Sequence, residues 1–384
     1  MKPIPYGTQS INEDDVAAVV EALHADFLTQ GPRVAEFEKL VAAYLGVKHA
    51  IAVNSGTAAL HLACMAIGLK PGQKIITTPI TFVASANAAR YCGAEVDFVD
   101  IDRNTRCLSA DLLEQRLSSV PAGTYSAIVA VDFGGYAADW ERLREIADRH
   151  KLYLIEDACH ALGGGFRDST GRHHQCASCS FADIAVLSFH PVKHVTTGEG
   201  GMILTNDDSI RDSALLFRTH GITKDAHLLR ENHGAWYYEM QDLGYNYRIT
   251  DIQCALGISQ FGRLDQGNKR RNEIATRYDE AFRGLPIVVQ EVSANRDPAY
   301  HLYVIETERR DELYSFLKSH AIHAQVHYVP VNMMPYYKDR GSHPESTPQA
   351  LGYYQRCLSL PMFPALTEEQ QDYVIGKIKE FFTK

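Results

Sequence analysis

Seven short apolar runs rich in β-branched residues alternate with helical patterns in the first part of the chain, and this alternation is the strongest constraint on its fold. The runs cover residues 50–53, 74–78, 95–101, 125–133, 153–157, 184–189 and 201–205. Strands that alternate with helices in this way form mostly parallel sheets that helices cover. The sequence therefore predicts an α/β fold with a mostly parallel sheet.

Two helices are predicted before the first of these strands. Residues 10–13 have the spacing of a capping box, with Ser10 as its first residue, and an apolar helical pattern follows at positions 16–23. A second helix is predicted over residues 34–45, with Gly46 as its stop.

The order of elements changes after residue 249. A long helical stretch to Gly284 is followed by a strand, a strand, a helix, a strand and a terminal helix, predicted over residues 287–292, 301–306, 311–320, 324–328 and 368–382. Residues 330–348 are predicted to be an irregular loop. We therefore expect a large domain over residues 1–250, and a linking helix with a smaller C-terminal α/β domain over residues 251–384.

Composition excludes several classes of protein. The chain has 384 residues, 22% of them charged, and a formal net charge of -9, which gives no general attraction to nucleic acid or to anionic membranes. No apolar stretch approaches the roughly 20 residues that a membrane-spanning helix needs. We expect a cytoplasmic protein that binds neither nucleic acid nor membrane.

The eight cysteines are scattered, which favours a reducing compartment over a disulfide framework. Cys176 and Cys179, with His173 and His174, resemble half of a zinc site. Because no second Cys-x-x-Cys pair is present, we expect a surface loop here and no metal.

Lys193 and Asp157 form the pairing with the clearest chemical meaning. Asp157 ends an apolar run, and Lys193 follows it by 36 residues in a glycine-rich segment before another strand. An amine that condenses with an aldehyde must be partly unprotonated, whereas a pyridine ring that draws electrons must stay protonated. One lysine and one buried carboxylate in this order indicate a pyridoxal phosphate enzyme. The alternative is a solvent-facing lysine and an acid that caps a turn.

Other candidates also lie at strand ends, where ligands gather in sheets of this class. Residues 54–60 follow a strand and open a helix, so their free amides suit a phosphate, unless Ser55 or Thr57 merely caps the helix. The Ser188 hydroxyl is close enough in sequence to Lys193 to contact the same phosphate. Phe82 either stacks on a pyridine ring or packs in the core. His160 follows Asp157 by three residues and can reach the same cofactor.

Two other classes of enzyme are rejected. The glycines at 163–165 do not form G-x-G-x-x-G, so no nicotinamide site is predicted. A nucleophile elbow is missing, which argues against a serine hydrolase. His190 is left unassigned.

With these residues in view, the chain resembles the sugar aminotransferases of the DegT/DnrJ/EryC1/StrS family, from residues 28–32 to residues 360–364. The most specific runs are residues 54–60, 156–163, 188–193 and 243–253. The resemblance implies a pyridoxal phosphate-dependent transferase of fold type I, like aspartate aminotransferase.

The resemblance also implies roles for individual residues. Lys193 would form the Schiff base with the cofactor and Asp157 would hold the ring nitrogen's proton, with Phe82 on the ring and His160 near the phenolic oxygen. The phosphate would be held by Gly56, Thr57 and Ser188. Asn246 would arrive from the neighbouring subunit of a homodimer, and the predicted substrate contacts are Arg248, Leu28, Thr29, His327 and Tyr328.

Within the family, residues 189–193, 244–248 and 324–330 are most similar to enzymes that aminate C4 of a UDP-linked 4-keto-6-deoxy-N-acetylhexosamine in pseudaminic acid biosynthesis, with L-glutamate as donor. Alternatives are C4 or C3 amination of another nucleotide ketosugar, of the perosamine or 4-amino-arabinose type. A dehydratase with histidine in place of the lysine is disfavoured by Lys193. A non-catalytic regulator that binds the cofactor is disfavoured because no basic patch or DNA-binding extension is present.

Overall fold

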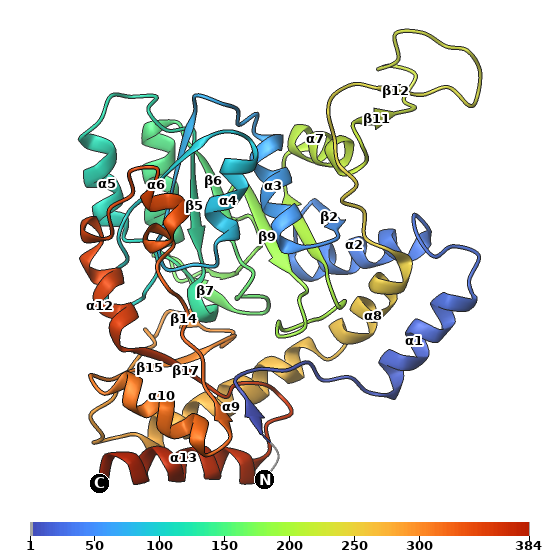
Figure 1. Ribbon diagram of the computed structural model, residues 1–384. Helices are drawn as coiled ribbons and strands as arrows, with labels where there is room; N and C mark the ends of the chain where they lie inside the picture. Colours follow the sequence, from blue (N-terminus) through green and yellow to red (C-terminus); the bar gives the residue numbers. More distant parts are fainter. Residues whose placement is uncertain (1–2, 384) are drawn as a thin grey trace.

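The computed structural model describes residues 3–383 and centres on a seven-stranded sheet (Figure 1). The strand order is β2-β10-β9-β6-β5-β3-β4, and only β10 runs antiparallel to its neighbours. These are the strands expected from the sequence: β2 (His49–Val53), β3 (Lys74–Thr77), β4 (Glu95–Phe98), β5 (Ala127–Val131), β6 (Tyr153–Asp157), β9 (Ile184–Ser188) and β10 (Gly201–Thr205). The predicted α/β fold with a mostly parallel sheet is confirmed.

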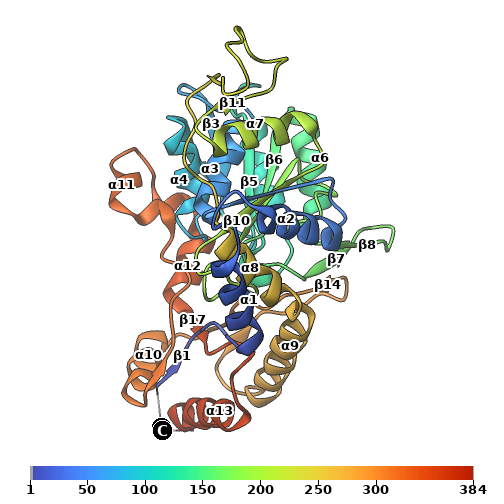
Figure 2. The same ribbon diagram turned by 90° about the vertical axis from the view of Figure 1, so that its right-hand side faces the viewer.

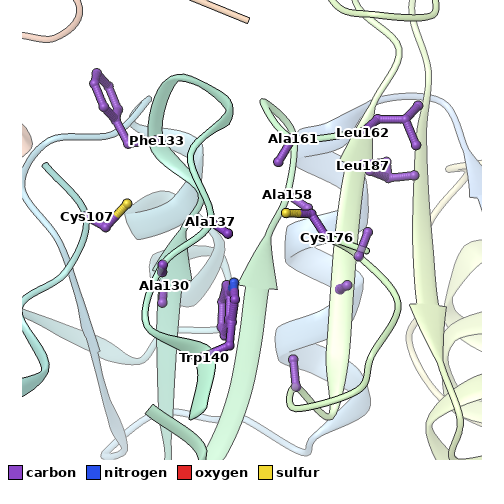
Figure 3. Packing of buried hydrophobic residues seen from close by; sticks show 14 of the residues in the cluster. Cys107, Ala130, Phe133, Ala137, Trp140, Ala158, Ala161, Leu162, Cys176 and Leu187 are labelled. Atoms are coloured by element: carbon purple, nitrogen blue, oxygen red, sulfur yellow. The ribbon is translucent and has the colours of Figure 1, made fainter. Parts of the chain in front are cut away.

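Helices cover both faces of the sheet because successive strand residues point to opposite sides. In β5, for example, Ile128 packs in the core with α2 (Pro32–Leu45), α5 (Ala110–Ser118) and α6 (Trp140–His150), while Val129 packs in a second core. The second core contains residues of α3 (Gly56–Ala66), α4 (Ala84–Tyr91) and α7 (Asp208–Arg218). In Figure 3 the fully buried Trp140 lies beside Ala130 and Ala137 in the first core.

The two N-terminal helices form as predicted, with one difference in capping. Helix α1 (Glu13–His24) is capped by Asn12, whose side chain accepts from the backbone N–H of Asp15 at 3.0 Å. Ser10 is therefore not the cap; its carbonyl instead accepts a hydrogen bond from Gln260 at 2.9 Å. Helix α2 ends at Gly46 in the left-handed conformation, with φ of 68°, as predicted.

The C-terminal part of the chain has a separate, smaller hydrophobic core. Strand β15 (Tyr303–Glu306) lies between β13 (Val288–Val289) and β17 (Cys357–Leu360), and α9 (Leu264–Ala281), α10 (Arg310–Ser319) and α13 (Glu368–Thr383) pack around them. The first strand of the chain, β1 (Ile4–Pro5), pairs in parallel with β16 (Ile322–His323) in this part. A domain boundary between residues 250 and 251 stays a prediction.

Several predictions for this part were wrong in detail. The long helical stretch is two helices, α8 (Asp251–Phe261) and α9, because the chain turns at Gly262. Residues 324–328 do not form a strand: only Gln325 makes an isolated bridge, to Ser359. Within the predicted loop 330–348 there are short helical turns at Val331–Met333, Pro335–Lys338 and Pro344–Ser346. The sequence reading also missed α12 (Pro348–Arg356) and β17.

The expected surface loop at the paired cysteines was also wrong. A small sheet of β7 (Gly165–Arg167), β8 (His173–Gln175) and β14 (Arg296–Asp297) leads directly into the core. Cys176 is fully buried, and the thiol of Cys179 donates to the Leu204 carbonyl at 3.3 Å.

One segment stands away from the body of the molecule. Strands β11 (Ile222–Thr223) and β12 (Glu239–Met240) form its base, and the chain between them projects outward at the upper right of Figure 1 and the top of Figure 2. We call residues 222–243 the arm. Its exposed apolar side chains are Leu228, Trp236, Tyr238, Met240 and Leu243. Among residues 3–383, no helix is long and apolar enough to cross a bilayer.

A buried ion pair connects the loop between β4 and α5 to the C-terminal part of the chain. Glu306, on β15, accepts from Arg106 at 2.8 Å, and the two side chains are only 7% and 2% exposed. Glu306→Leu would leave the Arg106 guanidinium buried without its partner. We expect this variant to lose about 3–5 kcal/mol of unfolding free energy, measured by urea denaturation.

Glu312→Ala is the matched control, because it removes an exposed pair with Arg309 whose loss costs less than about 1 kcal/mol. Equal stability of the two variants would contradict the assignment.

Candidate active site

Three parallel strands end side by side and set the position of the site. In the register of β5, β6 and β9, Val131 lies opposite Asp157, and Asp157 lies opposite Val186. Side chains at and just beyond these positions therefore emerge at one edge of the sheet. This edge brings together Asp157, Ser188 and the loop that carries Lys193.

The carboxylate of Asp157 is buried and fixed from both sides. One oxygen accepts from the Ser85 hydroxyl at 2.7 Å, and the other accepts from the backbone N–H of Cys159 at 3.2 Å. Ser85 is itself 2.7 Å from the Thr81 hydroxyl. The result is a carboxylate with a defined orientation and an exposed fraction of only 5%.

Lys193 lies in the same cluster, with its Nζ 3.4 Å from Nε2 of His301. Burial disfavours the ammonium and lowers the pKa of Lys193; the neighbouring Cys159 and Asp157 oppose this shift, and the positive charge of Arg271 adds to it. A lysine with a lowered pKa has more of the neutral amine at a given pH, which is the nucleophilic form.

A group of aromatic side chains packs around these residues. The rings of His160 and His301 are 4.4 Å apart, and the Tyr328 hydroxyl oxygen is 3.2 Å from Nε2 of His160. Burial, followed by the charge of Lys193, holds the pKa of His160 well below its usual range. Since Nδ1 accepts from the backbone N–H of Gly134 at 3.3 Å, the neutral ring carries its proton on Nε2 and donates it toward Tyr328.

The loop that supports His160 is held by a buried acid. Asp132 accepts from the backbone N–H of Ala138 and from the indole N–H of Trp140, both at 2.9 Å. Its carboxyl lies beside Glu156 and Cys176, with one ligand-type atom of each residue within 4.8 Å of the others. Burial raises the pKa of Asp132 to about 6, and burial and Asp132 raise the pKa of Glu156. The pair therefore retains a proton to higher pH than free carboxyl groups do, and Asp132 fixes the loop through its bonds to Ala138 and Trp140.

The first turn of α3 offers an anion cradle. Ser55 caps the helix by accepting from Ala58 N–H at 3.0 Å, which leaves the amides of Gly56 and Thr57 without intrahelical acceptors. A Cβ on Gly56 would meet the Cβ of Ser188 at 2.9 Å, and a Cβ on Gly201 would meet the Ser55 carbonyl oxygen at 2.4 Å. Both glycines are thus needed for the close approach that puts the Ser188 hydroxyl beside the helix N-terminus.

Phe82 lies on the side of the site that faces solvent. It lies five residues after the end of β3, is 56% exposed, and its ring lies 6.4 Å from that of Tyr328. The Phe82 carbonyl accepts from the Ser85 hydroxyl, which also donates to Asp157, so an exposed ring that can stack on a flat heterocycle lies on the segment that holds the carboxylate. The cradle, the ring, the acid and the lysine together fit pyridoxal phosphate.

His327 borders this cluster. It is buried, its Nδ1 is 2.8 Å from the Ser359 hydroxyl, and its ring is 5.0 Å from that of Tyr6. Tyr328 thus lies in the cluster and His327 at its border; their role as substrate contacts stays a prediction.

Four other predicted residues form a separate group. Thr29 bridges to Thr250, and the Leu28 carbonyl accepts from Asp251 at 3.0 Å. Arg248 lines a hollow of about 270 Å³ against α2, and the Asn246 carbonyl accepts from Asn54 at 3.3 Å. Within residues 3–383, no hydrogen bond or ring contact joins this group to Lys193, Asp157 or His160.

Sequence reasoning missed two members of the cluster. Ser85 is one helical turn after Thr81, a spacing that places both hydroxyls on one side and could have indicated it. His301 gave no signal, because it is one of 17 histidines and lies 108 residues from Lys193 in the sequence.

Comparison with known proteins agrees with this geometry. Residues 9–379 match the model of the DegT/DnrJ/EryC1/StrS aminotransferase family. The spore coat polysaccharide biosynthesis protein SpsC of Bacillus subtilis is 37% identical, over 98% of this chain and 96% of its own length. The UDP-4-amino-4,6-dideoxy-N-acetyl-beta-L-altrosamine transaminase of Campylobacter jejuni is 38% identical, over 87% of this chain and 86% of its own.

Solved structures confirm the predicted fold, that of pyridoxal phosphate-dependent transferases. Helicobacter pylori PseC, an aminotransferase involved in the biosynthesis of pseudoaminic acid, superposes with a TM-score of 0.89 at 30% identity and covers 100% of both chains. The PLP form of the sugar aminotransferase Spr1654 from Streptococcus pneumoniae gives 0.89 at 27% identity, over 99% of this chain and 98% of that one. By these matches the chain belongs to the DegT/DnrJ/EryC1/StrS aminotransferase family.

Proposed function

We propose that this aminotransferase moves the amino group of L-glutamate to C4 of a UDP-linked 4-keto-6-deoxy-N-acetylhexosamine, a step of pseudaminic acid biosynthesis. The observation that carries the proposal is that the half-buried Lys193 amine, whose pKa is lowered by desolvation, lies in one cluster with the Asp157 carboxylate, which Ser85 orients. The choice of sugar is supported by the names of the Campylobacter jejuni and Helicobacter pylori relatives. A cytoplasmic location stays a prediction.

The cofactor is pyridoxal 5′-phosphate, which supplies an aldehyde that takes up amino groups and a ring that withdraws electrons. In this chain the amides of Gly56 and Thr57 and the Ser188 hydroxyl would hold its phosphate. Phe82 would cover the ring, and Asp157 would keep the ring nitrogen protonated. Asn246 is proposed to act on the site of a neighbouring subunit.

Lys193 has two tasks in this proposal. Its Nζ would hold the cofactor covalently between turnovers, and once released it would take and return a proton at substrate carbon. Both tasks need a neutral amine within hydrogen-bond reach of the reacting atoms. Burial lowers the pKa of Lys193 and so favours that protonation state.

The neutral histidines around Lys193 favour this use of the amine. His160, His301 and His194 all have pKa values held well below the usual range, chiefly by burial. None of them therefore brings a full positive charge near the lysine at neutral pH. Their ring nitrogens can exchange hydrogen bonds with Lys193 and Tyr328 without adding a positive charge to the site.

We further propose a homodimer with shared active sites. The arm exposes large apolar side chains, with Trp236 at 74% and Leu243 at 69%, which a second copy would cover. Asn246 follows the arm directly, and with Arg248, Leu28 and Thr29 it lies outside the cluster around Lys193. A substrate site completed by the partner would explain that separation.

The amination is tested with a panel of nucleotide ketosugars, glutamate and the loaded enzyme, with products identified by NMR. We expect a 4-amino sugar from the UDP-linked N-acetyl ketone, and no product from Lys193→Ala. Lys379→Ala, on the exposed side of α13, is the control and should retain the parental rate. A product of the perosamine or 4-amino-arabinose type would show that another nucleotide ketosugar is the substrate. Turnover by Lys193→Ala would overturn the mechanism.

Capture of the cofactor by the apoenzyme should depend on the pH in a defined direction. Because the pKa of Lys193 is lowered, the rate should reach its plateau below the value of about 10.4 of an ordinary lysine. At pH values below the pKa of Lys193 in the folded apoenzyme, the same shift lowers the free energy of unfolding. This loss disappears as the pH rises from that pKa towards the pKa of Lys193 in the unfolded chain. Borohydride reduction at several pH values and mass spectrometry of the Lys193 peptide measure this; a midpoint at or above the ordinary value would contradict it.

Trp236→Ser tests the role of the arm. Loss of a buried interface tryptophan typically costs about 2 kcal/mol or more, so the dimer dissociation constant should rise at least about 30-fold. Analytical ultracentrifugation gives the dissociation constant. Tyr153→Ser, an exposed aromatic on β6, serves as the control. An unchanged constant for Trp236→Ser would remove the arm from the interface.

A further inference from the structure

A cavity of about 460 Å³ lies behind the loop that carries Lys193. Its walls are the N-terminal segment at residues 8–10, the loop at residues 191–196, one side of α9, and Pro364. This volume is within the range of about 300–1,000 Å³ typical of small-molecule sites.

The cavity is lined by basic side chains although the whole chain is acidic. Four of them come from the segment around the start of α9: Arg263, Lys269, Arg270 and Arg271. Two are neutralised within the protein, since Arg263 pairs with Asp15 at 2.8 Å and Arg270 pairs with Glu273 at 3.3 Å. Lys269 and Arg271 form no ion pair with any residue from 3 to 383.

Arg271 is the more unusual of the two. It is 2% exposed, and its Nη1 donates only to backbone carbonyls, those of Tyr300 at 3.2 Å, His301 at 3.4 Å and Met362 at 3.1 Å. Its Nε is buried without any acceptor. Burial lowers the pKa of the guanidinium to about 10, and no acid offsets that shift.

A structural role alone accounts for only part of this arrangement. The three carbonyl contacts explain why an arginine holds the C-terminal strand and turn together. They leave a buried positive charge without a counter-charge, which is costly in a protein interior. Lys269, which is exposed to solvent, brings a second positive charge to the same cavity.

We propose that this cavity binds a small oxyanion, the carboxylate or phosphate group of a metabolite, with Lys269 and Arg271 as its two charges. An anion there would supply the missing counter-charge of Arg271 and a partner for Lys269. Neither Gly56 nor Ser188 lines this cavity, whereas Lys193 does, so the cavity adjoins the catalytic lysine without including the phosphate cradle. The binding proposal does not depend on the proposed sugar, which guides only the choice of probes.

The test is isothermal titration calorimetry of the enzyme loaded with pyridoxal phosphate, so that the cradle at Gly56 is filled. Inorganic phosphate, 2-oxoglutarate and UDP are titrated separately; the first or third probe reports a phosphate site and the second a carboxylate site. Because 2-oxoglutarate and UDP also suit the catalytic site, only binding that a substitution of Lys269 weakens is assigned to this cavity. We expect saturable binding of at least one probe that weakens as salt is raised.

Variants at position 269 locate the binding. Lys269→Ala should weaken it at least about tenfold, the effect of losing one charge-assisted hydrogen bond. Lys269→Arg keeps the charge and should stay within about threefold of the parent, and Lys379→Ala is the surface control. Absence of saturable heat with all three probes, or equal affinity in Lys269→Ala and the parent, would overturn the proposal. Turnover of a ketosugar is not needed for any of these readouts, so failure of the proposed reaction would be seen separately.

Discussion

The parallel register of β5, β6 and β9 is the constraint on which the active site depends. It fixes Asp157 opposite Val131 on one side and Val186 on the other, two residues before Ser188. Hydrogen bonds from Ser85 and from the Cys159 amide then orient the carboxylate. A slip of one residue in β6 would turn Asp157 to the opposite face of the sheet and separate it from Ser85. The chemistry at Lys193 thus depends on strand pairing well away from the lysine itself.

The sequence predicted the residues that lie at strand ends because strands and helices in this chain have clear periodicity. All seven strands of the main sheet were found, and with them Asp157, Ser188, Gly56 and Phe82. What could not be found are contacts made through the tertiary fold. His301 approaches Lys193 only because the C-terminal part packs against the large sheet, and no local pattern marks it. Residues 324–328 alternate in polarity like a strand, yet only Gln325 bridges to Ser359 of β17. The side chains of His327 and Tyr328 contact those of Ser359 and His160, and neither residue pairs through its backbone in a ladder.

Lys193 has charged groups of both signs around it, and one of them, Arg271, also lines the cavity of about 460 Å³. The groups that act on Lys193 include the Asp157 carboxylate and the buried Arg271 guanidinium, which have opposite charges. The positive charge of Arg271 contributes to the lowered pKa of Lys193. The anion proposed above would oppose that contribution by neutralising Arg271.

The pairing of β1 with β16 has a consequence for how the chain is made. Ile4 is buried in the C-terminal core, and its strand partner Ile322 is translated more than 300 residues later. During synthesis the segment around Ile4 must wait, unpaired, until residue 322 has left the ribosome. A Cβ placed on Gly7, three residues after Ile4, would lie 3.7 Å from Val192, so this late-pairing segment runs beside the loop that carries Lys193. A nascent chain could assemble its large sheet early and still lack a finished catalytic centre.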